Sequence, residues 1–514
     1  MQHALRRDRF LPRSQEGITM TPELVAWIAF GAYALVTAGL ALRGMKKTTT
    51  LSGFALGNGD LGPVVTGITL AAAIASTATF VINPGFVYAH GLSALMHLGV
   101  ASFSGVLFGL LVLSKGFRKQ GMADGALTLP HWIGARYGHR PMRTYFAVLN
   151  LIAAVTFVVL IVKGSALVMQ HTLHIGYIAS LVIIVGFVFS YILMGGTYAH
   201  VFTNAFQGGL MVIVALAIVA SGLHLFADGI GPFMARVDAI DPNLVAFVNP
   251  DSSLFGDVFT VYVAGFVVGV ALVAQPHILT KSLYLGKDSD VPRYLLVGSV
   301  VCIIYTAVLL AGLYARVAYP DLAAQDAVMP AYLARAFSPI VGVLISVALL
   351  AAGMSTLDGI LVSASTIAAN DVFLGLVGKK LPEAQRQQVA LKASRYILVG
   401  LGVVSFVLAL DPPKLVGIFA QVGIYGLVAA SLVPIACGIL AKPAANDVFA
   451  ASIVAPLVHV AVYGSVVWVD GGVLNPAFSA TFGIFAALLT LGVLSLVRKA
   501  KTAPVHEAQM GASR

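Results

Sequence analysis

Two adjacent hydroxyl side chains, Ser355 and Thr356, lie in the middle of a long apolar stretch, LLAAGMSTLDGILVSASTIAAND. Lipid offers no water to hydrogen-bond, so polar groups at membrane depth must contact protein, an internal cavity or a bound ion. A sodium ion suits neutral oxygen ligands, namely hydroxyls on one helix and carbonyl oxygens freed where a neighbouring helix is broken. Alternatively, both hydroxyls bond the carbonyl one turn back or join two helices together. The pair is therefore a candidate cation site.

The surrounding chain has the composition of a membrane protein. Hydrophobic residues make up 59% of the 514 residues and charged residues 10%. Apolar runs repeatedly exceed the about 20 residues that cross a bilayer as a helix. We therefore expect an all-α polytopic membrane protein. Cys302 and Cys437 lie within apolar runs, so neither a disulfide framework nor a thiolate metal cluster is indicated.

About thirteen transmembrane helices are expected from the apolar windows. The windows are 23–43, 62–90, 91–114, 143–170, 175–195, 198–226, 255–279, 291–318, 338–368, 395–410, 415–440, 446–468 and 474–497. An odd number of spans places the two termini on opposite sides of the membrane.

The net charge of +10 indicates membrane orientation rather than a nucleic-acid partner, because the basic residues gather in particular connections. These connections carry Lys115, Arg118, Lys119, Arg136, Arg140 and Arg143, then Lys281, Lys287 and Arg293, then Lys379, Lys380, Arg386, Lys392 and Arg395. By the positive-inside rule that side is cytoplasmic, with the N-terminus outside and the C-terminus inside a bacterial-type inner membrane. Residues 1–22 are expected to be a disordered extension, and Met20 is a candidate start.

Two of the expected spans contain helix breakers. In AAAIASTATFVINPG, from Ala71 to Gly85, Pro84 cannot donate a backbone hydrogen bond, so carbonyls near it lose their partners. The seventh span has Gly265 and Gly269, followed by Gln-Pro-His at 275–277. If inverted repeats of five spans occupy 62–226 and 255–440, these two helices are the first of each repeat, as in transporters. An ordinary proline kink is the alternative.

Five stretches together resemble the sodium:solute symporters, which include proline, pantothenate, sugar, sialic acid and monocarboxylate carriers. They are LGNGDLGPVVTGITLAAA, NPGFVYAHGLS, GGTYAHVFTNAFQGGLM, QPHILTKSLYLGKD and AAGMSTLDGILVSAS. The resemblance implies a LeuT-like 5+5 inverted-repeat core with one extra helix before it and two after. The expected divisions are 1–22 (extension), 23–61 (extra helix and loop), 62–226 (repeat 1), 227–254 (extracytoplasmic loop), 255–440 (repeat 2) and 441–514 (two helices and tail).

The resemblance also implies a set of sodium ligands. They are the carbonyl oxygens of Ala72, Ala75 and Ala352 and the hydroxyls of Ser355 and Thr356. Many family members carry an Asp in the unwound segment where this chain has Ile74, and another where it has Asn204. Because a second sodium site depends on the latter position in some relatives, we expect one sodium ion per solute.

Lys163 and His97 are ionisable groups within spans, where such groups are costly without a partner or cavity. Lys163 is either the counter-ion of a carboxylated solute or a snorkelling or structural side chain, and His97 is either a pocket residue or a satisfied core histidine. Other candidates for contact with the solute are polar residues near the first break and on the eleventh span. They are Ser76, Thr77, Thr79, Asn83, Gln421 and Tyr425.

These features predict a sodium-coupled secondary active symporter that imports a small organic solute, with a carboxylate as one option, across the cytoplasmic membrane by alternating access. An enzyme is disfavoured because no HExxH, GxSxG or paired intramembrane acids occur, and Asp358 and Asp371 are interpreted as structural or helix-end groups. A proton-coupled symporter of the same fold and a non-transporting sensor are the alternatives. No obligatory protein partner is indicated.

Overall fold

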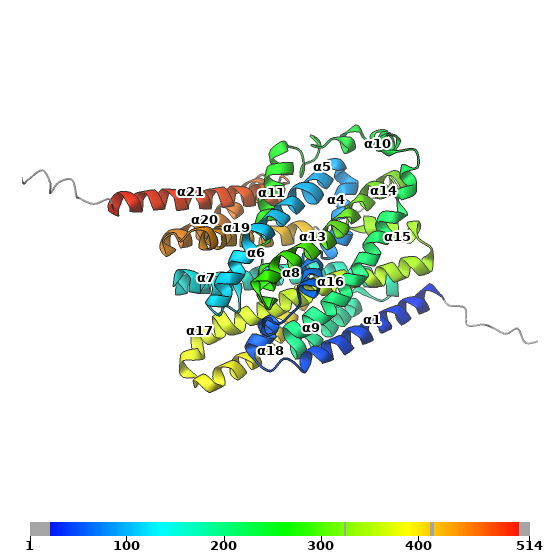
Figure 1. Cartoon of the computed structure of the whole chain (residues 1–514). Coiled ribbons are helices and arrows are strands. Elements are labelled where there is room, and N and C mark those ends of the chain that lie inside the picture. Colours follow the sequence, from blue (N-terminus) through cyan, green and yellow to red (C-terminus); the bar gives the residue numbers. More distant parts are fainter. Residues whose placement is uncertain (1–20, 323–324, 412–415, 503–514) are drawn as a thin grey trace, which may run out of the picture.

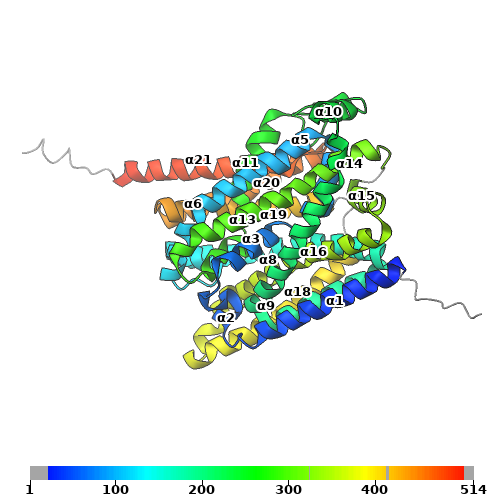
Figure 2. The same cartoon turned by 45° about the vertical axis from the view of Figure 1, so that its right-hand side comes forward.

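The computed structural model describes residues 21–322, 325–411 and 416–502, and every regular element within these ranges is a helix. The expectation for the first 20 residues therefore lies outside the described part of the chain. Long helices run side by side in one bundle, and the start of α1 and the end of α21 lie at opposite ends of it (Figures 1 and 2). The all-α membrane architecture predicted from composition is confirmed.

The long helices cross the bundle from end to end. They are α1 (Pro22–Met45), α6 (Ser102–Ala123), α8 (Arg140–Leu173), α9 (Tyr177–Ser221), α13 (Val291–Thr306) with α14 (Leu310–Ala318), α16 (Pro339–Ile367), α18 (Glu383–Leu410), α19 (Val416–Leu440), α20 (Ala445–Gly464) and α21 (Pro476–Thr502). Shorter helices connect them or cap the bundle: α2 (Leu51–Leu56), α5 (Leu92–Leu95), α7 (Leu129–Tyr137), α10 (Ile230–Asp238), α15 (Val328–Ala336) and α17 (Leu374–Val377).

Within the described ranges, ten helices are long and apolar enough to cross a membrane, and two bent pairs raise the number to 12. The remaining segment of the thirteen expected is Tyr177–Leu193, which is apolar but shorter. It is continuous with the rest of α9 through Gly196, whose positive φ of 52° kinks the helix. The count of thirteen is therefore not confirmed, and the difference arises from this one kinked helix.

The first bent pair is the second expected span. Its first half is α3 (Pro63–Ile74), and its second half comprises the π-helical turn η2 (Ala78–Ile82) and α4 (Asn83–His90). The two halves meet at 56°. Pro63 begins α3, where its missing amide hydrogen is not needed. A discontinuity in this span is confirmed, and it lies within the expected stretch from Ala71 to Gly85, although it precedes Pro84.

The second bent pair is the seventh expected span. A π-helical turn η6 (Phe259–Ala264) and α11 (Gly265–Leu272) form its first half, and α12 (Pro276–Leu279) with the 3-10 turn η7 (Thr280–Tyr284) forms the second. The halves meet at 63°, at the Gln-Pro-His motif. Beyond the break, the Leu61 amide donates to the Tyr284 carbonyl (3.0 Å), and Leu61 and Leu285 form an isolated parallel bridge. The start of α3 is thus joined to the end of η7.

Small residues let α11 cross α6 closely. A Cβ atom on Gly269 would lie 2.1 Å from the Ser102 carbonyl oxygen, and one on Gly105 would lie 2.2 Å from the Phe266 carbonyl oxygen. Contacts of this kind replace hydrophobic driving force in membrane helix packing. Gly265 and Gly269 therefore serve helix packing.

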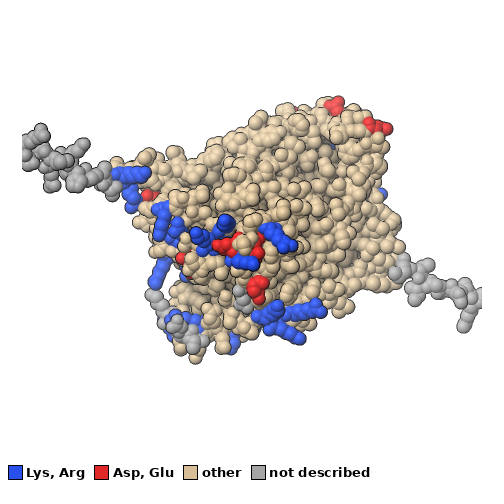
Figure 3. Space-filling model, in the orientation of Figure 1, with Lys and Arg blue, Asp and Glu red and all other residues tan. Residues whose placement is uncertain are grey.

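The spans that contain α16 and α19 are the most deeply buried. In each of them, 67% of the most apolar window is buried inside the protein, compared with 33% for α1. Lys and Arg side chains gather at one end of the molecule, near the end of α21 and the loops around α17 and α18 (Figure 3). The hydroxyl pair thus lies in a buried helix, and the basic residues lie at one end of the bundle.

Candidate functional site

Five oxygen atoms from α3, its break and α16 converge around the Ser-Thr pair. Ser355 Oγ lies 3.0 Å from the Ala72 carbonyl oxygen and 2.9 Å from that of Ala352. Thr356 Oγ1 lies 3.4, 3.3 and 3.5 Å from the carbonyl oxygens of Ala72, Ala75 and Ala352. Both hydroxyl side chains are fully buried. The structure therefore brings together the five oxygens that the resemblance implies as sodium ligands; that they bind sodium stays a prediction.

The local sequence explains why these carbonyls are available. Ala75 has an extended backbone (φ −85°, ψ 109°), which ends the hydrogen-bond ladder of α3 and leaves its last carbonyls to find other partners. The Ala78 amide donates to Ser76 Oγ (3.1 Å), so a side chain satisfies one donor at the start of the next helical segment. The Ala-Ser-Thr sequence therefore builds the break.

Pro84 was expected to cause this break, but it lies beyond the break. Pro84 lies in the first turn of α4, where a proline needs no hydrogen-bond donor, and the π-helical turn η2 accommodates it. The backbone leaves the helix two turns earlier, at Ala75. The freed carbonyls therefore face α16 rather than the proline.

A second Ser-Thr pair on α16 provides an internal contrast. Ser365 and Thr366 are also buried, but their hydroxyls lie 2.7 Å from the carbonyl oxygens of Leu361 and Val362 in their own helix. These bonds are the ordinary back-bonding of membrane helices. The Ser355 and Thr356 hydroxyls contact both their own helix and the broken one, which is the arrangement that a small cation needs.

Asn204 on α9 supports the pair from the other side. Its amide nitrogen Nδ2 donates to the Ser355 carbonyl oxygen (3.1 Å), and the side chain is fully buried. A neutral amide therefore contacts the backbone of the pair from α9.

A cavity of about 180 Å³ lies beside the break in α3. Of the predicted solute-contacting residues, those that line it are Ser76, Thr79, Asn83, Gln421 and Tyr425. Ile74 and Ala75 also line it, so the cavity adjoins the oxygen cluster. The structure therefore places the candidate solute pocket and the candidate ion site on the same break.

Three predicted residues lie outside the lining of this cavity. Thr77 is directed toward α16, where a Cβ on Gly353 would be 2.7 Å from its hydroxyl oxygen. His97 Nδ1 contacts the Thr260 carbonyl oxygen (2.8 Å), which is the contact of a satisfied core histidine. Lys163 acts electrostatically on Asp326: burial raises the pKa of that loop carboxyl, and the Lys163 ammonium partly lowers it. Whether any of the three contacts a solute stays a prediction.

Several residues that line the cavity were not singled out from the sequence. They include Gln275 at the second break and Thr306 and Tyr305 at the end of α13. The sequence indicated Gln275 only as part of a helix breaker. Its position between two half-helices could have indicated that it lines the cavity, because transporters bind solutes at such breaks. Nothing in the apolar sequence of α13 distinguishes the face that lines the cavity.

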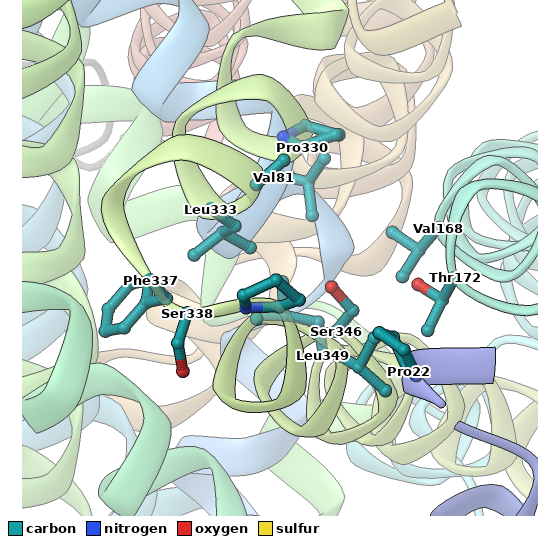
Figure 4. Close-up of a pocket in the computed structure, with 14 residues that line it drawn as sticks. Pro22, Val81, Val168, Thr172, Pro330, Leu333, Phe337, Ser338, Ser346 and Leu349 are labelled. Carbon is teal, nitrogen blue, oxygen red and sulfur yellow. The ribbon is translucent and has the colours of Figure 1, made fainter. Parts of the chain in front are cut away.

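Another cavity, of about 230 Å³, lies between α15, the end of α8 and the first half of α16 (Figure 4). Its lining is mainly aliphatic, with hydroxyls from Thr172, Ser338 and Ser346. On α16 the lining ends at Leu349, one turn before Ala352. It carries no charged side chain and is separate from the cavity at the break.

Comparisons with known proteins agree with this geometry. A sodium/pantothenate symporter of Escherichia coli (strain K12) is 27% identical over 416 residues, which cover 79% of this chain and 84% of that symporter. An osmoregulated proline transporter of Bacillus subtilis (strain 168) is 25% identical over 273 residues, covering 51% of this chain and 52% of the transporter.

Two solved structures share the fold. A Na⁺-coupled sialic acid symporter in a substrate-bound outward-open state matches with a TM-score of 0.77 at 17% identity, covering 93% of this chain and 98% of its own. A nucleobase-cation-symport-1 family transporter matches with a TM-score of 0.55 at 14% identity, covering 87% and 95%. These likenesses confirm a LeuT-like inverted-repeat transporter fold. The family model of the sodium:solute symporters matches residues 54–454, and the chain therefore belongs to the sodium:solute symporter family.

Proposed function

We propose that this membrane transporter is a symporter that couples the downhill entry of one sodium ion to the uptake of one small organic solute. The observation that carries the proposal is the convergence of the Ser355 and Thr356 hydroxyls with the carbonyl oxygens of Ala72, Ala75 and Ala352. Uncharged oxygens of this kind suit sodium, which is the transported cargo of the site.

Coupling follows from the position of this cluster. A sodium ion held there binds α16 to the end of α3, and the same break lines the 180 Å³ cavity. The ion therefore stabilises the form of the cavity that binds solute, and its departure loosens the pocket. In this scheme the repeats at 62–226 and 255–440 move against each other around the site.

We propose a small carboxylated molecule as the solute. The relatives named above are a pantothenate symporter and a proline transporter, and both of those compounds carry a carboxylate. The cavity supplies the hydrogen-bonding side chains of Ser76, Asn83 and Gln421, while the remainder of its lining is largely apolar. Import toward the cytoplasm follows if the end rich in Lys and Arg is cytoplasmic, as the positive-inside rule favours (Figure 3).

Uptake into proteoliposomes tests the proposal. A panel of labelled pantothenate, proline and short monocarboxylates is offered under an inward sodium gradient, and separately under a proton gradient alone. Sodium-driven accumulation of at least one solute is expected, and accumulation under the proton gradient alone would contradict sodium coupling. A sodium Hill coefficient near two would contradict the stoichiometry.

The double variant Ser355→Ala/Thr356→Ala is expected to abolish the sodium dependence, because it removes two of five ligands. The matched control is Ser365→Ala/Thr366→Ala, which removes an identical pair that bonds only to Leu361 and Val362 within the described structure. Unchanged sodium stimulation in the first variant would remove the proposed site.

A further inference from the structure

The second broken helix ends in a charged side chain that is fully buried. Lys281, in η7, has an exposed fraction of 0%. Its place at the end of a span indicated a loop cation, but the structure places it against α9 and α16. An ionisable group at such a position is costly unless it is paired, and it marks a functional site.

Lys281 begins a chain of hydrogen bonds that ends in a buried carboxylate. Its Nζ lies 2.6 Å from His200 Nε2, and His200 Nδ1 lies 2.8 Å from Asp358 Oδ1. An ammonium that donates to Nε2 of a neutral imidazole, which in turn donates from Nδ1 to a carboxylate, gives a consistent order of donors and acceptors along the chain. The three side chains therefore hold one positive and one negative charge.

The carboxylate is firmly held on its other side as well. Tyr191 and Thr203, both on α9, offer hydroxyls to Asp358 Oδ2 at 3.2 and 3.1 Å. Asp358 and His200 are each 0% exposed. The charged form of Asp358 thus has three hydrogen-bond donors, all on α9, and its counter-charge is the ammonium at the far end of the imidazole.

This charged cluster adjoins the candidate sodium site. Asp358 follows Ser355 by three residues on α16, a spacing that places the two on neighbouring positions of the helix surface, and Asn204 lies one turn beyond His200 on α9. Asn204 contacts the Ser355 carbonyl through Nδ2, while its acceptor Oδ1 is buried with no hydrogen-bond partner among the described residues. A carboxylate and an unpartnered carbonyl-type oxygen next to a cation site are the ligands that a second cation would use.

We propose that the Lys281 ammonium is a resident cation that takes the place of a second metal ion beside the sodium site. It neutralises Asp358 through His200, so the chain binds a single sodium ion. Because the ammonium is covalently attached to η7, it balances the carboxylate throughout transport and cannot leave with the solute. This inference rests on the proposed sodium coupling and names the residue that limits the coupling to one ion.

Binding of ²²Na⁺ to the purified full-length protein, measured as ions per chain with no solute present, tests this inference. The wild type is expected to bind one ion. Lys281→Gln removes the charge and is expected to bind two ions, since Asp358 and Asn204 Oδ1 then need a cation. Lys281→Arg keeps the charge and is expected to bind one. Lys287→Gln, at an exposed position, is the matched control and is expected to bind one ion.

The double variant Lys281→Gln/Asp358→Asn removes both charges and is expected to return to one bound ion. Two ions in the wild type, or one ion with unchanged affinity in Lys281→Gln, would overturn this inference and leave sodium coupling intact. No bound ion in the wild type would overturn the inference together with the proposed sodium coupling. If Lys281→Gln does not fold, Lys281→Met removes the same charge with a side chain of similar length and is expected to bind two ions; one ion at unchanged affinity in that variant would overturn the inference.

Discussion

The two broken helices have similar geometry but different chemistry. The halves meet at 56° in the first and 63° in the second, and each break faces the buried helix α16 or its neighbours. The first presents backbone carbonyls to neutral hydroxyls, whereas the second carries Lys281, which reaches Asp358 through His200. The two breaks therefore share a backbone shape, whereas the side chains around them differ: the first is surrounded by uncharged oxygens and the second carries a buried charged chain.

The largest expected effect comes from removing the charge of Lys281 at the second broken helix. Lys281→Ala leaves the Asp358 carboxylate buried without its counter-charge, which costs about 3–5 kcal/mol of folding stability. We expect a lower unfolding temperature in detergent, partly restored by sodium chloride but not by choline chloride, because a bound cation stabilises the folded state. The exposed Lys287→Ala is the control. An unfolding temperature equal to that of the wild type would show that the buried pair is unimportant.

An intermediate effect is expected from filling space beside each break in turn. A Cβ on Gly353 would lie 2.1 Å from Ser165 Oγ and 2.7 Å from Thr77 Oγ1, whereas one on Gly359 would lie 3.1 Å from His200 Cε1. Overpacking costs about 1–3 kcal/mol, offset by about 1 kcal/mol of helix propensity from Ala. Gly353→Ala should therefore displace Thr77 at the first break and weaken ²²Na⁺ binding about tenfold.

Gly359→Ala is the paired variant, and its sodium affinity should stay within about threefold of the wild type because His200 needs to shift only slightly. If Gly359→Ala bound sodium more weakly than Gly353→Ala, sodium binding would depend more on the second break than on the first.

The smallest structural change tests the neutral ligands. Thr356→Ser keeps the hydroxyl and should leave sodium affinity within about threefold of the wild type, whereas the isosteric Thr356→Val removes the oxygen and should lower it by at least about tenfold. Sodium titration of uptake or of ²²Na⁺ binding compares the two. Equal affinities in the two variants would mean that the Thr356 oxygen is not a ligand.

Much of the fold was predictable because bilayer physics constrains it so strongly. Apolar runs gave the helices, and the Gln-Pro-His motif gave the second break. Pro84 was not the cause of the first break, because a proline in the first turn of a helix is tolerated. The cause is the extended backbone at Ala75, which has no comparable sequence signal.

The site was predictable only in part. Ser355-Thr356 and Ser365-Thr366 are the same dipeptide on the same helix, and only the position of α3 distinguishes their roles. The pair at 355–356 was singled out as a candidate cation site from the apolar run that contains it, and the resemblance to a family added the carbonyl oxygens of Ala72, Ala75 and Ala352. Lys281 was missed for the opposite reason: a lysine at the end of a span is normally a loop residue, and its burial depends on His200 and Asp358, which are distant in sequence.

The short backbone bridge between Leu61 and the residues that end η7 has a mechanical consequence. It joins the beginning of α3 to the arm that carries Lys281, at the end of α3 opposite Ala72 and Ala75. Because α3 is an unbroken rod between these points, a swing of that arm pulls the rod lengthwise and shifts the carbonyls at its tip. Under the proposed sodium coupling, opening the protein on that side and releasing the ion would therefore be a single movement.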